Sequence, residues 1–160
     1  MQIVELDKNY FEQTKDLLVE LQKYVIEIDK YNLNIISKDY REKYFEYMIE
    51  DCKDSQGKVF VALEKCEVLG MIAGMVQKYD DRDELDYSCP KKGLICELIV
   101  NKNCRSGGVG TKLLKTMENY FKEINCEYSQ IDVFAYNENA KKFYYKNGYV
   151  DRMITVFKKL

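Results

Sequence analysis

The sequence predicts a mixed α/β fold in which a single layer of sheet has helices packed against it. Short β-rich runs alternate along the chain with longer segments of helical periodicity. The hydrophobic fraction of 46% and the charged fraction of 32% are typical of globular proteins. A length of 160 residues is typical of one domain. We therefore expect residues 1–160 to form a single domain with the element order β-α-α-β-β-β-α-β-α-β.

The N-terminal half is expected to contain one strand, two helices and a hairpin. Residues 1–7 form a short strand candidate, and the helical spacing of Leu17, Leu18, Leu21, Val25 and Ile28 predicts a helix that ends near Lys30. A second helix begins near Ser37 and carries tyrosines at positions 40, 44 and 47. We interpret this tyrosine stripe as core packing or as the wall of a groove. Two β-rich runs, 58–64 and 68–77, flank a tight turn and predict a β-hairpin.

A polar loop over residues 79–92 follows the hairpin and contains the only proline of the chain. Between positions 79 and 87 it carries five acidic residues against Arg82 alone. Two interpretations stay open, a solvated surface loop or a segment that attracts a cationic substrate.

The C-terminal half alternates strands and helices. Residues 93–102 are apolar apart from Glu97 and the polar end of the segment, as expected of a central strand that is buried on both faces. The remaining expected elements are a helix over 109–124, a strand over 129–137, a short helix over 137–149 and a closing strand over 152–160.

Composition excludes several classes of function. The net charge of −2 does not favour nucleic acid as a partner, because phosphate binding needs a basic surface. No signal peptide and no membrane span are apparent, so we expect a cytoplasmic protein without a membrane partner. The six cysteines have irregular spacing and there is no histidine, so no metal site is expected. The lack of histidine also excludes Ser–His–Asp and Cys–His catalysis.

The stretch CRSGGVGTKLL, residues 104–114, places three glycines between an apolar strand and a helix. The first N–H groups of a helix lack internal partners, and glycines let a phosphate approach them, so a pyrophosphate site is predicted. A loop that merely needs positive φ angles is the alternative. The G-x-G-x-x-G and P-loop patterns both fail here. The pattern that fits is R-x-x-G-x-G, met by Arg105, Gly108 and Gly110.

Two motifs together resemble the GCN5-related N-acetyltransferase (GNAT) family. VNKNCRSGGVG matches the family pattern V-x-x-x-x-R-x-x-G-x-G/A that wraps the pyrophosphate of coenzyme A. NENAKKFYYKNGY matches N-x-x-A-x-x-F/L-Y-x-K-x-G-F/Y. The motif-level resemblance covers residues 94–149. The order of the expected elements extends the resemblance over the whole chain, weakly before residue 58.

The resemblance implies a mostly antiparallel central sheet of about six to seven strands flanked by about four helices. It also implies an acyltransferase that moves the acetyl group of acetyl-CoA directly to a primary amine, without a metal. The acidic loop favours a cationic small molecule, such as a polyamine or an aminoglycoside-like compound, as acceptor. A non-catalytic acyl-CoA-binding or regulatory domain, a protein N-terminal or lysine acetyltransferase, another acyl-CoA donor and a homodimer stay open.

The resemblance assigns roles to individual residues. Glu97, the only carboxylate of the central strand, is the candidate base or substrate anchor, with Asp132 in reserve; many relatives place the base where this chain has Cys96. Strand alternation would put Cys96 and Glu97 on opposite faces, although relatives often have a bulge here. Tyr144 matches the general acid, and the neighbouring Tyr145 is expected to point elsewhere. A cysteine-bound acetyl intermediate is disfavoured because no cysteine has a neighbouring base.

The remaining assigned residues would bind acetyl-CoA. Asn137 would cap its helix and touch the pantetheine or phosphate arm. The backbone of Leu98, Ile99 and Val100 would bind the pantetheine like an added strand and donate one N–H to the thioester oxygen. The pyrophosphate loop would comprise Arg105, Ser106, Gly107, Gly108, Val109, Gly110 and Thr111.

Overall fold

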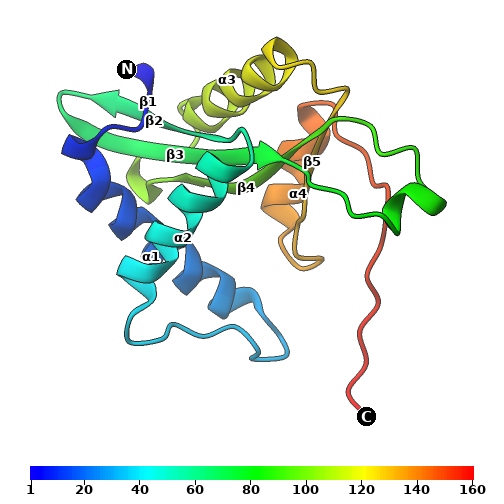
Figure 1. The fold of residues 1–160 in the computed structure, drawn as a ribbon. Coiled ribbons are helices and arrows are strands. Elements are labelled where there is room, and N and C mark those ends of the chain that lie inside the picture. The colour runs from blue at the N-terminus through cyan, green and yellow to red at the C-terminus, as the bar shows by residue number, and fades with distance from the viewer.

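The computed structural model describes residues 1–160 as a sheet covered by helices on both faces (Figure 1). The strands are β1 (Gln2–Glu5), β2 (Lys58–Glu64), β3 (Glu67–Val76), β4 (Lys92–Val100) and β5 (Tyr128–Ile131). The α-helices are α1 (Phe11–Ile28), α2 (Tyr40–Asp54), α3 (Val109–Glu123) and α4 (Glu138–Lys146). Three short 3-10 turns are η1 (Lys8–Tyr10), η2 (Asp83–Leu85) and η3 (Lys102–Cys104).

The five strands lie in the order β1-β2-β3-β4-β5. The first four are antiparallel to their neighbours, and β5 runs parallel to β4. The expected mixed and mostly antiparallel sheet with four helices is therefore confirmed. No helix combines the length and hydrophobicity that a membrane crossing requires.

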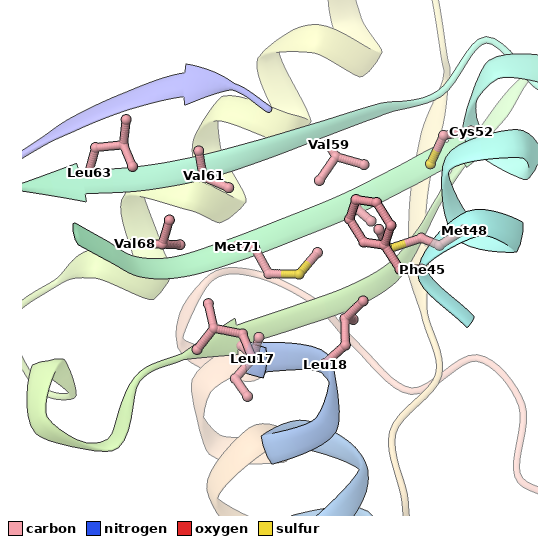
Figure 2. Packing of buried hydrophobic residues seen from close by; sticks show 12 residues of the cluster. Leu17, Leu18, Phe45, Met48, Cys52, Val59, Val61, Leu63, Val68 and Met71 are labelled. Carbon is pink, nitrogen blue, oxygen red and sulfur yellow. The ribbon is translucent and has the colours of Figure 1, made fainter. Parts of the chain in front are cut away.

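Each face of the sheet has its own apolar core, because side chains alternate along each strand. On one face, α1 and α2 pack buried side chains against β2 and β3 (Figure 2). This cluster includes Leu17, Leu18, Phe45, Met48, Val59, Val61 and Met71. On the other face, α3 packs against the sheet, and α4 adds Tyr144. This second cluster includes Ile72, Ile95, Leu113, Leu114, Met117 and Phe121.

The expected sixth strand is wrong, and the fifth is shorter than expected. Residues 152–160 form no strand, because no other strand of the chain lies beside them to complete a ladder. Strand β5 ends at Ile131 rather than near residue 137. A turn closes just beyond it, where the Asn137 N–H donates to the Phe134 carbonyl at 2.8 Å. That turn leads the chain out of the sheet and into α4.

Strand β4 has two irregularities near its middle: it loses its partner β5 after Ile95, and it has a bulge at Cys96. Strand β5 pairs only with Lys92–Ile95, so the edge of β4 that faces β5 has no strand beyond this point. On the other side, Ile95 lies opposite Gly74 and Glu97 lies opposite Ala73, so Cys96 is an extra residue. Such a bulge interrupts the alternation of side chains.

Candidate active site

The loop that precedes α3 presents a row of unpaired backbone donors. The N–H groups of residues 105–111 donate to no atom of the chain, and the first bond into the helix runs from the Lys112 N–H to the Gly108 carbonyl at 3.1 Å. Ser106 and Gly108 both have positive φ angles, 67° and 77°, which curl the loop around these donors. Donors gathered at the positive end of a helix form an anion site.

The glycines of this loop serve different purposes. Gly108 needs its left-handed conformation, and a Cβ atom built there would meet nothing within 4 Å, so open space lies in front of it. A Cβ atom on Gly110 would lie 3.5 Å from both the Phe143 ring and the Val100 side chain. These are ordinary packing distances, so the space around Gly110 would accept a methyl group, whereas Gly108 is required for the backbone conformation on the open side of the loop.

Arg105 ties this loop to the end of β4. Its Nε donates to the Val100 carbonyl at 3.2 Å, and the side chain forms no ion pair. The guanidinium charge is thus available to an anion in the loop. Thr111 is partly buried in the first turn of α3.

The free edge of β4 leads from this loop toward Glu97. Leu98, Ile99 and Val100 pair with β3 on one side, and no strand pairs with them on the side of β5. Backbone groups on that side can bind an extended molecule as a strand would.

Asn137 stands at the N-terminus of α4, where the predicted cap is present. Its Oδ1 accepts hydrogen bonds from the Ala140 N–H at 3.1 Å and from the Tyr24 hydroxyl at 3.2 Å. Tyr24 belongs to α1, so this hydrogen bond joins two helices that are far apart in the sequence. Tyr24 is not among the site residues predicted from the sequence, because no local signal in the chain identifies it.

Glu97 is held by a tyrosine of α2. The Tyr44 hydroxyl donates a hydrogen bond to the Glu97 carboxylate. Burial raises the pKa of Glu97 above its ordinary value, and the hydrogen bond from Tyr44 opposes part of that rise. The Tyr44 ring stacks on Tyr40, with ring centroids 4.8 Å apart and an interplanar angle of 15°. Of the tyrosine stripe, Tyr40 and Tyr44 thus lie beside Glu97, whereas Tyr47 is 59% exposed and belongs to no core.

The bulge brings Cys96 and Glu97 to the same side of β4. Glu97 contacts Tyr44 of α2, and Cys96 lies close enough to Cys52 and Asp51, also of α2, for both to influence the pKa of its thiol. Burial raises the pKa of Cys96 to about 12, so this thiol stays protonated and is a poor nucleophile. The reserve carboxylate, Asp132, is exposed and accepts a hydrogen bond from the Gln130 side chain at 3.3 Å.

Tyr144 is buried, with 7% of its surface exposed. Its ring packs edge-on against Phe143 and Tyr149, at centroid distances of 5.1 and 5.6 Å. Burial raises the pKa of Tyr144, and the neighbouring Tyr149 and Glu97 raise it further, so the phenol keeps its proton. Tyr145 points away as expected, and its hydroxyl donates to Asp151 at 2.8 Å.

Two carboxylates of the acidic loop accept hydrogen bonds from backbone N–H groups of the same loop. One Asp80 carboxylate oxygen accepts from the N–H groups of Arg82 and Asp83, and the Asp83 carboxylate accepts from the Asp80 N–H at 2.8 Å. Asp81, Glu84 and Asp86 form no ion pair. The chain contains no group of three or more residues that could hold a metal ion.

Known proteins resemble this chain in sequence and in fold. The model of the Acetyltransferase (GNAT) family matches residues 22–149. The uncharacterized N-acetyltransferase MJ1530 of Methanocaldococcus jannaschii is 49% identical over 63 residues, which is 39% of this chain and 40% of that protein. The matched part thus spans about two fifths of the length of this curated relative.

Solved structures share the fold. A mutant of the BH1408 protein from Bacillus halodurans has a TM-score of 0.86 and 16% identity, covering 100% of this chain and 99% of that chain. The aminoglycoside N-acetyltransferase AAC(6')-Iy in complex with CoA has a TM-score of 0.71 and 13% identity, covering 99% of this chain and 98% of that chain. The family model covers most of the sequence and both motifs, so the chain belongs to the GNAT acetyltransferase family.

Proposed function

We propose that residues 1–160 act as one domain that transfers the acetyl group of acetyl-CoA directly to a primary amine. The observation that carries this proposal is the continuous path from the unpaired N–H groups of residues 105–111, along the free edge of β4, to Glu97. Membership of the GNAT family supports the proposal, as does the CoA bound to a structure with the same fold.

Acetyl-CoA fits the residues along this path. The N–H groups of the loop and the Arg105 guanidinium would hold the pyrophosphate, because both offer hydrogen-bond donors to an anion. The unpaired backbone of Leu98–Val100 would hold the pantetheine arm, with Asn137 beside it. When bound, acetyl-CoA supplies the thioester whose acetyl group is transferred.

Glu97 would act as the base. An alkyl ammonium has a pKa of about 10.4, so it must lose a proton before its nitrogen can attack. The raised pKa of Glu97 brings the carboxylate closer to the range in which it can take that proton, directly or through water. Anchoring the ammonium group of the substrate is its alternative role.

Strand β4 would stabilise the oxyanion, and helix α4 would supply the acid that protonates the leaving sulfur. A backbone N–H of β4 would donate to the oxyanion that develops as the nitrogen–carbon bond forms. Tyr144 would give its proton to the sulfur as the carbon–sulfur bond breaks, because the buried phenol is protonated at neutral pH. The nitrogen loses two protons in all. The first would pass to Glu97 or to water, and the second, released as the amide forms, would restore the phenol of Tyr144 through water.

The acceptor we propose is a cationic small-molecule amine. The stacked rings of Tyr40 and Tyr44 lie beside the Glu97 carboxylate, and an ammonium group favours both an aromatic face and a negative charge. The three unpaired carboxylates of the 79–87 loop would draw cations to the protein. An aminoglycoside N-acetyltransferase among the structures with this fold supports the same choice.

Calorimetric titration with acetyl-CoA tests the proposed cofactor site. Gly108→Glu places a negative side chain in the open space of the loop, and we expect it to abolish binding. Asn119→Glu is the matched control, because it adds the same charge to an exposed site on the same helix. Since Gly108 has a positive φ, thermal unfolding of both variants must show that the fold is retained.

An amine screen then separates an enzyme from a non-catalytic acyl-CoA-binding domain. Spermine, aminoglycosides, neutral amines and peptides with free amino groups would be offered with acetyl-CoA, with Tyr144→Phe as the control. Turnover of the cationic small molecules that falls in Tyr144→Phe supports the proposal. Binding of acetyl-CoA without turnover of any amine favours the non-catalytic alternative, and preference for peptides or neutral amines contradicts the proposed acceptor.

A further inference from the structure

One hydrogen bond joins α1 to the N-terminus of α4. The Tyr24 hydroxyl donates to Asn137 Oδ1 at 3.2 Å, and both side chains are half-buried. Asn137 ends the turn that leads the chain out of the sheet after β5, where the edge of β4 has no strand beside it. The bond therefore lies at the part of the sheet that we propose for the pantetheine arm.

Tyr24 is placed by the buried face of α1. It follows Leu17 by seven positions and Leu21 by three, so the three side chains share one face of the helix. Leu17 is buried and Leu21 packs against the same apolar cluster, which fixes the direction of this face. A tyrosine at the end of such a face keeps its ring partly buried and directs its hydroxyl to a polar partner. The ring thus serves packing, and the hydroxyl is free to serve the site.

Two donors determine which end of the Asn137 amide is free. The Ala140 N–H can only donate, so the amide must turn its oxygen toward it, at 3.1 Å. The Tyr24 hydroxyl donates to the same oxygen and reinforces this orientation. Both protons of Nδ2 are then left without an acceptor in the chain. An amide nitrogen held in this way can donate to a carbonyl oxygen of a ligand.

A second contact keeps α1 beside this turn without the Tyr24 hydroxyl. The Lys30 ammonium group lies 3.8 Å from the centre of the Tyr136 ring, and Tyr136 immediately precedes Asn137. The buried leucines of α1 hold the helix on the sheet independently of this contact. Loss of the Tyr24 hydroxyl should therefore leave α1 in place, so its effect would be confined to the amide of Asn137.

We propose that Tyr24 is a positioning residue for acetyl-CoA: its hydroxyl holds the Asn137 amide so that the nitrogen is free to donate to an amide carbonyl of the pantetheine arm. This role rests on the acetyl-CoA site proposed above. The carbonyl oxygens of the arm need donors once water has been excluded from them. Because the arm does not react, the hydrogen bond from Asn137 is the same before and during acetyl transfer, and Tyr24 affects binding rather than the chemical step.

Calorimetric titration of acetyl-CoA into Tyr24→Phe tests this role, because the substitution keeps the ring and removes only the hydroxyl. We expect the affinity to fall about fivefold relative to the native protein, which is the effect of one neutral hydrogen bond. Tyr31→Phe is the matched control and should keep the native affinity, since the Tyr31 hydroxyl donates at 3.2 Å to the Phe157 carbonyl and not to Asn137. With an amine found by the screen, Tyr24→Phe should raise the KM for acetyl-CoA and leave kcat unchanged.

Asn137→Ser shows whether Tyr24 acts through the amide. Serine is as good an N-cap residue as asparagine but has no amide nitrogen, so this variant should keep the unfolding temperature and lose affinity for acetyl-CoA. In the Asn137→Ser background, Tyr24→Phe should have no further effect on affinity. An equal fall in both backgrounds means that Tyr24 acts independently of Asn137 and overturns the proposal.

Failure of the acetyl-CoA site itself gives a different result from failure of the positioning role. A native protein that binds no acetyl-CoA contradicts the proposed function, and the role of Tyr24 with it. A native protein that binds acetyl-CoA, and whose Tyr24→Phe variant binds it equally well, contradicts only the role of Tyr24. A fall in kcat with an unchanged KM in Tyr24→Phe contradicts that role as well.

Discussion

Replacing Tyr44 by phenylalanine tests whether the Tyr44–Glu97 hydrogen bond sets the working pH of the proposed base. The substitution keeps the ring that stacks on Tyr40 and removes only the hydroxyl. Because that hydroxyl donates to the carboxylate, it favours the ionised form of Glu97 and lowers its pKa against the effect of burial. Without it, the pKa of Glu97 rises further.

The size of the effect follows from the exposure of the bond. A hydrogen bond to a charged group contributes about 1.5–3 kcal/mol, and one pKa unit corresponds to about 1.4 kcal/mol. Tyr44 is 36% exposed, so water replaces part of the lost bond and the lower end applies. We expect the pKa of Glu97 to rise by about one unit.

The assay is the pH profile of kcat/KM with the best amine of the screen. Because the base must be ionised to act, the acidic limb of the profile should move about one pH unit higher. At pH values below the limb, kcat/KM should fall about tenfold, and at pH values above it kcat/KM should change little. Tyr47→Phe is the matched control, since Tyr47 lies on the same helix and its hydroxyl forms no hydrogen bond within the chain. An acidic limb that stays in place in Tyr44→Phe, or moves equally in Tyr47→Phe, refutes the reasoning.

Three further outcomes follow from the structure. The folded state raises the pKa of Glu97, so ionising its carboxyl group costs stability as pH rises from about 4.5 through the folded pKa. The melting temperature of Glu97→Gln, relative to that of the native protein, should therefore increase between pH 4 and pH 8. Equal differences in melting temperature at both pH values would contradict this. Asn137→Ala removes the hydrogen bond that caps the Ala140 N–H and should lower the free energy of unfolding by about 1 kcal/mol. The same variant should bind acetyl-CoA more weakly. Unchanged affinity in calorimetry would show that Asn137 does not belong to the cofactor site. A Cβ atom on Gly93 would lie 2.3 Å from the Phe121 ring, so Gly93→Ala should cost about 1–3 kcal/mol in urea unfolding, and a neutral result would show that the ring moves freely.

The sequence predicted the parts of the fold that depend on local pattern. The spacing of Leu113, Leu114, Met117 and Phe121 predicted α3 and its buried face, which the structure confirms. The strands β2 to β4 were likewise predicted from β-rich runs. The two motifs identified the family from residues close together in sequence.

Contacts between distant segments were beyond prediction. The hydrogen bond from Tyr44 to Glu97 spans 53 positions, and the one from Tyr24 to Asn137 spans 113. Neither tyrosine differs locally from one that packs in a core. Alternation alone would also separate Cys96 from Glu97, and only the register of β3 against β4 reveals the bulge that brings them together.

The closing strand shows a different limit of the sequence pattern. Residues 152–160 have the composition of a strand, but a strand exists only where an edge receives it. The pattern indicates that this segment can form a strand and does not indicate which edge would receive it. This is why residues 152–160 are predicted as a sixth strand but lie exposed outside the sheet.

The turn at Phe134–Asn137 connects the topology of the sheet with the proposed cofactor site. It ends β5 after Ile131, so β5 reaches only the first part of β4. Beyond Ile95 the edge of β4 is therefore free for an extended ligand, and Glu97, which follows the bulge at Cys96, lies beside this free edge within reach of Tyr44. A strand that continued to residue 137, as the sequence pattern alone predicts, would occupy the edge that we propose for the pantetheine arm.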